Sequence, residues 1–340
     1  MERIHYKQRH LKTVSLFAGA GGLDLGFLNA GFNIIWANDF DKHAVQSYEA
    51  NVGKHIVYGD INNYINEIPA HDVLIAGFPC QPFSMMGEQQ GFDDERGTLF
   101  FTIEKILKRH NTKIIVLENV KNLETHDEGK TFEKMKSILE KKLNYKFFHK
   151  VINTADYRIP HTRRRLFIVG FRNDYYLKNN ITFEFPPEVK LTTSLQDLLD
   201  VEVEEKYFLS EKILKTVMAS GTKNYKAKAE IDLTIARPLC ATMHKMHRAS
   251  QDNYVTDNIN RNKFVSLDKP ISNVRRLTPN ECRKLQGFPS DWEYVVSDTQ
   301  LYRQFGNAVT VDVAYYIASQ IVLGLGETIE FEIEKNEVLV

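Results

Sequence analysis

Short apolar runs alternate with stretches of helical spacing through the first half of the chain. The apolar runs that predict strands are 13–17, 33–37, 55–58, 73–76, 114–117, 145–152 and 166–171. Helical spacing follows the first strand as far as Ala30 and recurs at 44–50, 98–108 and 131–142. This alternation predicts βαβ units. We therefore expect an α/β fold, a doubly wound and mostly parallel sheet with helices on both faces.

The pattern changes at 179–189, around Pro186-Pro187, which predicts a domain boundary. We expect a large domain at 1–185, a smaller one at 186–275, a hinge and return segment at 276–303, and a C-terminal segment at 304–340 whose helix packs back on the first domain.

Thr278 and Glu281 form a capping box around Pro279 and predict a helix that ends at Gly287. The stretch 306–320 predicts a turn and a helix. The tail 329–334 alternates and is either an edge strand or a frayed acidic end.

Composition is that of an ordinary globular protein, with 43% hydrophobic and 26% charged residues. The formal net charge is zero, but 206–276 holds 14 Lys and Arg against 6 Asp and Glu, which leaves 30 against 38 elsewhere. A basic segment on an acidic body is typical of a module that faces nucleic acid. The alternative is a solvated basic face.

Three cysteines, Cys80, Cys240 and Cys282, are too few and too scattered for a disulfide framework or a zinc site. We expect no bound metal and a reducing compartment such as the cytoplasm. The N-terminus has no secretory signal, and no apolar run is long enough to cross a membrane.

A glycine-rich turn, Phe17-Ala18-Gly19-Ala20-Gly21-Gly22, follows the first predicted strand. Glycines there permit a tight turn and close approach of a ligand to the backbone. Asp39 follows the second strand, where a carboxylate accepts hydrogen bonds from ribose hydroxyls, and Asp60 follows the third, where it suits an adenine amino group. Phe40 can pack on the adenine face. These features favour an adenosine-containing ligand; the alternative is that both acids cap helices.

Cys80 lies between two prolines directly after the fourth strand, in Gly77-Phe78-Pro79-Cys80-Gln81-Pro82. Prolines fix φ and so give the thiol a set direction, although a lone Cys is more often a small buried residue. The polar loop 84–97 has the composition of a lid.

Glu118 ends a further strand. Arg163 and Arg165 flank Arg164 just before the strand at 166, and period-2 alternation would point both the same way.

Six motifs occur in order along the chain. They are Phe17-Ala18-Gly19-Ala20-Gly21-Gly22, Pro79-Cys80-Gln81, Glu118-Asn119-Val120, Arg163-Arg164-Arg165, Arg276-Leu277-Thr278 through Gln286-Gly287-Phe288-Pro289, and Gly306-Asn307-Ala308-Val309. Together they resemble the bacterial DNA (cytosine-5)-methyltransferases of restriction–modification systems. The resemblance implies the S-adenosylmethionine-dependent methyltransferase fold with a second, smaller DNA-recognition domain.

The resemblance implies transfer of a methyl group from S-adenosylmethionine to C5 of a cytosine in a specific duplex DNA sequence. Cytosine C5 is a poor nucleophile, and addition of a thiolate at C6 turns the ring into an enamine whose C5 can attack the methyl group. Cys80 matches the family's nucleophile. Glu118 matches the residue that bonds N3 and the 4-amino group, for which burial would have to raise its pKa. Arg165 matches the residue that steadies the base and the developing charge, and Arg163 of the same motif is a further catalytic candidate. We expect water to take the C5 proton.

Cofactor positions also carry over with the resemblance. They are Phe17, Ala18, Gly19, Gly21, Gly22, Asp39, Phe40, Asp60, Ile61 and Pro79, with Asn307 closing the site from the C-terminal return. One residue departs from the family pattern, since many relatives have Gln where this chain has His161. We expect His161 to be a buried histidine with satisfied hydrogen bonds and not a catalytic group.

Chemistry on C5 requires the base to leave the stack, so a second lobe must hold the DNA. By resemblance, target recognition lies between the Arg163–Arg165 motif and the Arg276 motif, the interval that contains the basic segment. The candidate DNA-binding residues are Gln81, Ser84, His244, Arg248, Gln251 and Asn253. Arg pairs with guanine, and Gln or Asn with adenine. The alternative for each is a place on a solvated loop.

Double-stranded DNA is the expected partner, and the resemblance implies a companion restriction endonuclease without direct contact. We expect a monomer. Two other functions stay open, a tRNA cytosine-5 methyltransferase on the same scaffold and a non-catalytic DNA-binding regulator. The basic segment favours DNA over tRNA, and the presence of Cys80, Glu118 and Arg165 favours an enzyme.

Overall fold

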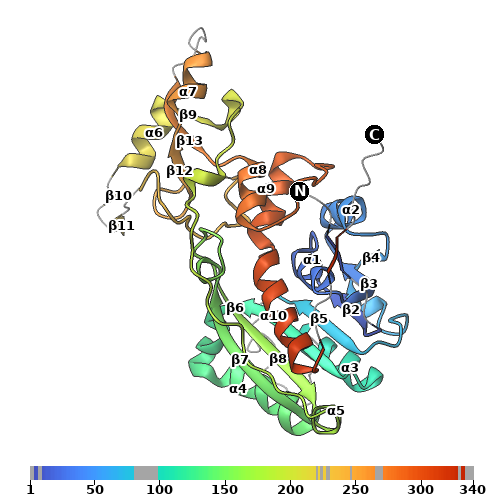
Figure 1. Cartoon of the computed structure of the whole chain (residues 1–340). Coiled ribbons are helices and arrows are strands. Elements are labelled where there is room, and N and C mark those ends of the chain that lie inside the picture. The colour runs from blue at the N-terminus through green and yellow to red at the C-terminus, as the bar shows by residue number, and fades with distance from the viewer. Residues whose placement is uncertain are drawn as a thin grey trace, which may run out of the picture. The chain divides into compact units, whose positions relative to one another are not determined.

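The computed structural model describes residues 4–6, 10–79, 99–219, 221–222, 225–226, 230–245, 247–264, 271–327 and 331–333 (Figure 1). The chain divides into two compact units. The first comprises Met1–Ile152, Arg164–Pro187 and Val311–Val340, and the second Asn153–Arg163 and Glu188–Thr310. The chain passes from the first unit to the second after Pro187, close to the predicted domain boundary. The segment 153–163 and the whole of 276–310 belong to the second unit, so the expected hinge is an integral part of it.

A seven-stranded sheet forms the centre of the first unit, in the order β4-β3-β2-β5-β6-β8-β7. Its strands are β2 (Lys12–Leu16), β3 (Asn33–Asp39), β4 (Ile56–Tyr58), β5 (Val73–Gly77), β6 (Ile114–Val120), β7 (Tyr145–Asn153) and β8 (Arg164–Arg172). The strands from β4 to β6 are parallel, and β8 runs antiparallel to β6. The predicted mostly parallel sheet is therefore confirmed.

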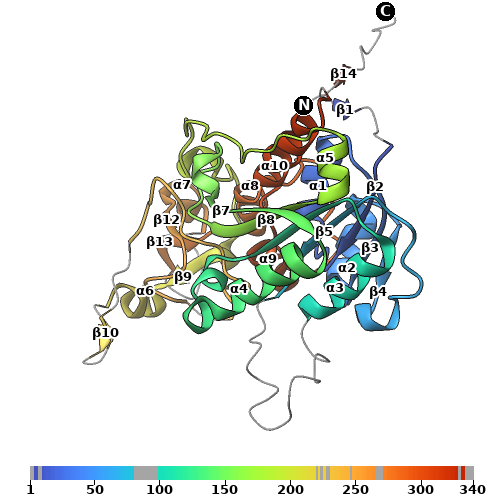
Figure 2. The ribbon, with the colours of Figure 1, turned by 90° about the horizontal axis from the view of Figure 1, so that it is seen from below.

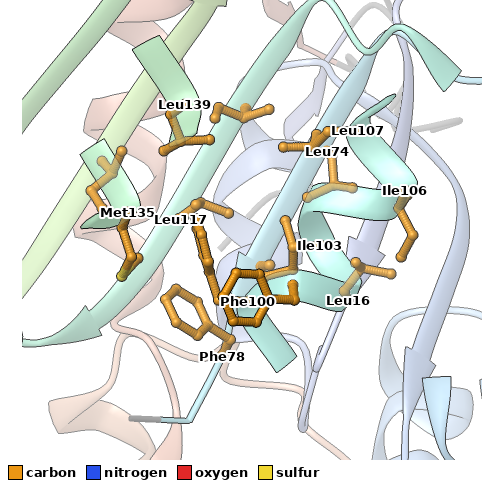
Figure 3. Packing of buried hydrophobic residues seen from close by; sticks show 14 of the residues in the cluster. Leu16, Leu74, Phe78, Phe100, Ile103, Ile106, Leu107, Leu117, Met135 and Leu139 are labelled. Atoms are coloured by element: carbon orange, nitrogen blue, oxygen red, sulfur yellow. The ribbon is translucent and has the colours of Figure 1, made fainter. Parts of the chain in front are cut away.

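Helices cover both faces of this sheet (Figure 2). The helices of the first unit are α1 (Gly22–Asn29), α2 (Lys42–Asn51), α3 (Leu99–His110), α4 (Lys130–Ser137), α5 (Asn173–Lys178) and α10 (Val311–Gly324). Val14 and Leu16 of β2 join the apolar cluster beneath α3 and α4 (Figure 3). Ser15, between them, points to the opposite face, where its hydroxyl donates to Asp24 of α1 at 2.9 Å. Burial of both faces is what a parallel sheet requires.

The C-terminal helix α10 packs against α1. A methyl group added at Gly26 of α1 would lie 2.4 Å from the Ala314 side chain, so only glycine permits this approach. The predicted turn and helix at 306–320 are displaced: Gly306 lies inside α9 (Asp298–Asn307), and α10 begins only at Val311. The tail forms a strand, β14 (Phe331–Ile333), which pairs antiparallel with β1 (Ile4–Tyr6).

The second unit is built on the small antiparallel sheet β12-β13-β9. Its strands and helices are β9 (Phe208–Ser210), α6 (Glu211–Met218), β10 (Gly221–Thr222), β11 (Tyr225–Lys226), β12 (Tyr254–Thr256), α7 (Asn258–Arg261), β13 (Ile271–Arg276), α8 (Pro279–Leu285) and α9. The predicted capping box is present, because Thr278 caps the amide of Glu281 and the Glu281 carboxylate accepts from the amide of Thr278.

A buried ion-pair cluster ties β13 to α8. Both guanidinium Nη atoms of Arg275 donate to the Glu281 carboxylate, at 2.9 and 2.8 Å, and its Nε donates to Asp257 at 2.8 Å. Arg275 is 1% exposed and Glu281 is fully buried. The main-chain amide of Asp200 also donates to Glu281 at 2.8 Å. A buried pair with this many partners makes removal of either member costly.

Replacing Glu281 with glutamine is expected to lower the free energy of unfolding of the second unit by about 3 kcal/mol, because the buried Arg275 charge then lacks its bidentate partner. Urea titration, followed by a probe in the second unit, measures the change. Glu202, which is exposed and 3.8 Å from Lys263, provides the control, and Glu202→Gln should stay within about 0.5 kcal/mol of the parent. Equal effects of the two substitutions would contradict the role given to Glu281.

Candidate active site

Six chain segments meet at one edge of the large sheet. The parallel strands β2 to β6 end there, and the antiparallel β8 begins there. The register places Gly77 of β5 opposite Glu118 of β6, and Arg165 of β8 opposite Val120. In open α/β sheets, ligands bind at this carboxyl edge.

The glycine-rich turn after β2 is held in left-handed backbone conformations. Phe17, Gly19 and Gly21 have φ angles of 56°, 58° and 92°. At Gly21 an added methyl group would lie 2.8 Å from the side chain of Val52, which directly follows α2, so glycine is required there for both space and conformation. At Gly19 no heavy atom lies within 4 Å of the corresponding position. The turn therefore leaves open space beside its backbone.

Asp39 fixes this turn from the end of β3. Its carboxylate accepts the amide of Gly19 at 2.8 Å and the amide of Asp41 at 2.7 Å. The side chain is buried, and burial raises the pKa of the carboxyl above its ordinary value, while the two amide bonds oppose that rise. The residue that caps α2 is Asp41. The alternative that Asp39 only caps a helix is therefore wrong.

Asp60 does cap a short helix, since its carboxylate accepts the amide of Asn62 at 2.9 Å. Beside it, Ile61 is buried, at 2% exposure. Two aromatic side chains at the same edge are open to solvent, Phe40 at 66% and Tyr58 at 53%. An exposed aromatic ring next to a buried carboxylate is an arrangement that suits a planar ring with a polar substituent.

A buried hydrogen-bonded acid, which the sequence did not reveal, lies in the helix that follows the turn. Asp24 accepts from the hydroxyl of Ser15 at 2.9 Å and from the hydroxyl of Tyr48 at 2.7 Å. The Tyr48 hydroxyl also lies 3.0 Å from His55 Nε2. Complete burial raises the pKa of Asp24 to about 6. This network joins β2, α1 and α2 beneath the turn, and so supports its shape.

The segment that leads into Cys80 is anchored to β6. Asn119 donates from its side-chain amide to the carbonyl of Phe78 at 2.8 Å. Phe78 is 6% exposed and belongs to the central apolar cluster. These contacts fix Phe78 and Pro79, the last residue before Cys80. Cys80 itself, with Gln81 and Ser84, lies outside the described residues.

Glu118 and Arg165 form an ion pair across β6 and β8. The Nε of Arg165 lies 3.0 Å from Oε1 of Glu118. Glu118 is buried at 7% exposure, and the Arg165 side chain is 22% exposed. The antiparallel register explains the pair, because β6 continues past its predicted end to Val120 in order to meet β8. The structure therefore brings Glu118 and Arg165, two of the four predicted catalytic residues, together at one position of the sheet.

Arg163 does not share this position. β8 begins at Arg164, so the expected alternation does not extend to Arg163, which belongs to the second unit. Its guanidinium Nη1 donates to the carbonyls of Leu239 and Gly306 at 3.2 and 3.1 Å, and the residue is 1% exposed. The expectation that Arg163 and Arg165 point the same way was wrong. Arg163 fixes backbone in the second unit.

The candidate DNA-binding residues of the second unit lie on one loop. Arg248 donates to the Gln251 side chain at 2.7 Å and also to the Thr242 hydroxyl. His244 Nδ1 lies 3.0 Å from the carbonyl of Ala241. Arg248 and His244 are partly exposed, and Gln251 is exposed. These three side chains are thus at the surface and already ordered by local hydrogen bonds.

Asn253 has a different environment. It is 7% exposed, and its amide accepts from the main-chain nitrogen of Arg237 at 2.8 Å and donates to the carbonyl of Arg237 at 3.0 Å. Both polar atoms of its side chain therefore hold the base of the loop, which corrects its assignment as a base reader. Asn307, expected to close the cofactor site, is exposed at the last residue of α9 in the second unit.

Several basic residues of the 206–276 segment are committed internally. Arg275 is buried in its ion pairs, Arg237 lies 2.7 Å from Glu230, and Arg276 donates to the His247 ring at 2.7 Å. Burial and the neighbouring Arg276 lower the pKa of His247 to about 4. The exposed lysines Lys212 and Lys245 are among those that remain for contact with a polyanion. The count of charges therefore overstates the basic surface.

Within the described residues, no group of three or more His, Cys, Asp or Glu side chains is arranged to hold a metal ion. A helix long and apolar enough to cross a bilayer is likewise absent from this part of the chain.

Comparison with known proteins matches residues 11–323 to the family model of the C-5 cytosine-specific DNA methylases. The chain is 39% identical to the Type II methyltransferase M.DsaV of Dactylococcopsis salina over 331 residues, which cover 93% of this chain and 87% of that protein. It is 36% identical to the Type II methyltransferase M.HhaI of Haemophilus parahaemolyticus over 324 residues, 92% of this chain and 94% of that one.

Among solved structures, the S. pombe Dnmt2 methyltransferase shares the fold with a TM-score of 0.71 at 21% identity, over 93% of this chain and 99% of that chain. The Entamoeba histolytica methyltransferase EhMeth gives the same TM-score of 0.71 at 20% identity, over 94% and 99%. At this level of identity, the likeness concerns the fold alone.

Proposed function

The chain belongs to the C-5 cytosine-specific DNA methylases, and from this premise we propose that Glu118, Arg165 and Cys80 carry out its methylation of cytosine in specific DNA sequences. The observation that carries the assignment is the ion pair of 3.0 Å between Glu118 and Arg165. It lies where β6 and β8 meet, and Asn119, next to Glu118, anchors the segment that leads to Cys80. Acid, guanidinium and thiol thus belong to neighbouring chain segments.

The edge formed by β2, β3 and β4 fits S-adenosylmethionine. The open space at Gly19 admits a ligand beside the backbone, the buried Asp39 carboxylate suits ribose hydroxyls, and the exposed Phe40 ring suits an adenine face. The residues proposed to hold the cofactor are Phe17, Ala18, Gly19, Gly21, Gly22, Asp39, Phe40, Asp60, Ile61, Pro79 and Asn307. When bound, S-adenosylmethionine supplies an electrophilic methyl group on a sulfonium sulfur.

The protein's own groups act on the base. The Cys80 thiolate adds to C6, which moves electron density onto C5 and makes it nucleophilic. Glu118 holds a proton at N3 and accepts a hydrogen bond from the 4-amino group. The negative charge that the addition would otherwise place on the ring is therefore neutralised at N3. Arg165 orients the Glu118 carboxyl and the base. After C5 is methylated, its proton passes to water and the Cys80–C6 bond breaks, which restores the aromatic ring.

Asp39→Asn is expected to raise the Kd for S-adenosylmethionine roughly 10- to 100-fold, because a neutral amide replaces the charged acceptor of ribose hydroxyls and of the turn amides. Isothermal titration calorimetry measures the change. Asp41→Asn is the matched control, since asparagine still caps α2 and affinity should stay within about twofold. An equal rise in the Kd for S-adenosylmethionine in both variants would show that Asp39 acts only through the local fold.

The second unit is proposed to read the target sequence. A cytosine must leave the helix to reach a thiol, and the loop that carries His244, Arg248 and Gln251 offers polar side chains for base edges and phosphates. Gln81 and Ser84, close to Cys80 in sequence, are proposed to contact the DNA at the same base. Relatives named Type II methyltransferases support a role beside a companion restriction endonuclease that cuts the same site. We propose a monomer that acts in the cytoplasm on double-stranded DNA.

Bisulfite sequencing of DNA from cells that express the protein tests this function. We expect one recurrent sequence with a protected cytosine, absent from cells without the protein. Transfer of a labelled methyl group to duplex DNA and to tRNA is then compared in vitro. Labelling of tRNA alone would overturn the proposed substrate, and labelling of neither would overturn the proposed activity.

A further inference from the structure

The segment 153–163 connects β7 and β8 of the first unit, yet it folds as part of the second. Its backbone pairs with residue 236, because Thr162 donates to the carbonyl of Ala236 and Ala236 donates to the carbonyl of Pro160, both at 2.8 Å. Ala236 is fully buried. The segment therefore meets the chain just before the loop that carries the candidate base readers.

His161 holds the next part of that chain. The main-chain nitrogen of Leu239 donates to His161 Nε2 at 3.1 Å, so Nε2 carries no proton. The proton is then on Nδ1, which donates to the carbonyl of Leu285 at the end of α8, also at 3.1 Å. His161 is fully buried. Both ring nitrogens are thus used, and the imidazole connects Leu239 to α8.

Arg163 binds the main-chain carbonyl of Leu239, the residue whose main-chain nitrogen His161 binds. Its Nη1 donates to the carbonyl of Leu239 at 3.2 Å and to the carbonyl of Gly306 in α9 at 3.1 Å. The two main-chain groups of Leu239 are therefore bound by two buried side chains that lie two positions apart in sequence. Each side chain also reaches the end of a different helix, α8 or α9.

Gly306 adds a steric limit at the next two residues. A methyl group at Gly306 would lie 2.4 Å from the carbonyl carbon of Cys240 and 2.4 Å from the nitrogen of Ala241. Because Gly306 has helical backbone, space and not conformation is what excludes a side chain there. The backbone at Cys240–Ala241 thus rests directly on α9.

The far end of the loop is fixed separately. Asn253 brackets the main chain of Arg237, and the Arg237 guanidinium donates to the carbonyl of Ala249 at 3.0 Å. Between these anchors lie His244, Arg248 and Gln251. The position of those side chains is therefore set by the anchors at Leu239 and Asn253 and by the local bonds of Arg248.

We propose that His161, Arg163 and Gly306 form a clamp on 239–241 that sets the position of the loop residues 242–245 and 247–252, and that they are positioning residues for choice of the target sequence. The inference rests on the proposed role of this loop in reading DNA. It replaces the catalytic role expected for Arg163. The clamp acts on the backbone at 239–241, so its loss should change which sites are methylated without preventing cofactor binding at Asp39 and the turn 17–22 of the first unit.

The test compares His161→Leu, His161→Gln and Gly306→Ala with the parent full-length protein. Leucine cannot bond to Leu239 or Leu285, whereas a glutamine amide can accept at one atom and donate at the other. We expect His161→Leu to raise KM for the duplex that carries the bisulfite-identified site about tenfold, and to reduce the preference over single-base variants of it by a similar factor. His161→Gln should restore both.

KM for S-adenosylmethionine should stay within about twofold in every variant. Gly306→Ala should weaken site preference although it removes no hydrogen bond, because the loop must shift by several tenths of an ångström or more. The exposed His43, replaced by leucine, is the matched control and should change nothing.

If the parent methylates a defined site and both His161→Leu and Gly306→Ala keep its preference, the clamp has no part in recognition and the inference is overturned. If the parent itself shows no site preference, the proposed function fails instead. If His161→Leu misfolds and loses cofactor binding, Gly306→Ala and His161→Gln provide the test instead. Unchanged site preference in Gly306→Ala would then count against the clamp.

Discussion

Replacing Cys80 with serine is expected to lower kcat for methyl transfer by at least about 10⁴-fold, while Kd for S-adenosylmethionine and for duplex DNA changes by less than about threefold. The physical reason is that a serine hydroxyl is far less ionised near neutral pH than a thiol and cannot add effectively to C6. The binding groups proposed here belong to other residues, so binding should persist. Single-turnover transfer of a labelled methyl group measures the rate.

A covalent trap gives the same prediction a second readout. In DNA with 5-fluorocytosine at the target position, C5 carries fluorine instead of hydrogen, so the adduct cannot eliminate after methylation and stays attached to the protein. The parent should form a denaturation-resistant complex, and Cys80→Ser should form none. Cys240→Ser is the matched control, since a hydroxyl can still donate to the carbonyl of Pro238 as the Cys240 thiol does at 3.6 Å. An adduct that forms with serine at position 80 would show that another group is the nucleophile.

The strands of the first unit could be predicted closely because they are short, apolar and bounded by glycine, proline or acidic residues. The runs of β2, β5 and β6 are buried on both faces, so local sequence alone marks them. The largest difference at one end of a strand is at β6, whose last residues Glu118, Asn119 and Val120 are polar or exposed. Their strand conformation comes from pairing with β8, a contact between distant residues that local pattern does not contain.

The second unit was harder to predict because long-range hydrogen bonds define it. The assignment of 153–163 to this unit depends on Ala236, Leu239, Leu285 and Gly306. Local sequence predicts a turn at Gly306, as it usually does for glycine. In the structure Gly306 lies inside α9, and glycine is needed there because a side chain would strike the backbone of Ala241. Glycine selected for close packing has no local signal that distinguishes it from glycine selected for a turn.

Residue type also proved an incomplete guide to role. Arg163 and Arg165 are chemically identical and two positions apart, yet one binds main-chain carbonyls in the second unit and the other pairs with Glu118. Asn253 has the side chain that pairs best with adenine, but both of its polar atoms are used by Arg237. Which polar side chains are free to act depends on their partners, and partners appear only when the chain is folded.

Glu118→Gln is expected to slow methyl transfer about 10²- to 10³-fold and to weaken duplex binding less than about threefold. Glutamine has the shape of glutamate but cannot transfer a proton to N3, and as a neutral group it no longer attracts the Arg165 guanidinium, 3.0 Å away in the parent. Single-turnover rates and fluorescence anisotropy measure the two effects. The exposed Glu133, replaced by glutamine, is the matched control and should leave both unchanged.

The trap separates this residue from the nucleophile. Because Cys80 is intact in Glu118→Gln, the 5-fluorocytosine adduct should still form to the same final extent, but at a rate reduced by about the same factor as transfer, since protonation at N3 assists addition at C6. Cys80→Ser should give no adduct at any time. A Glu118→Gln protein that loses rate and DNA affinity equally would place Glu118 among the groups that only bind the base. An adduct rate equal to that of the parent would place its action after the addition step.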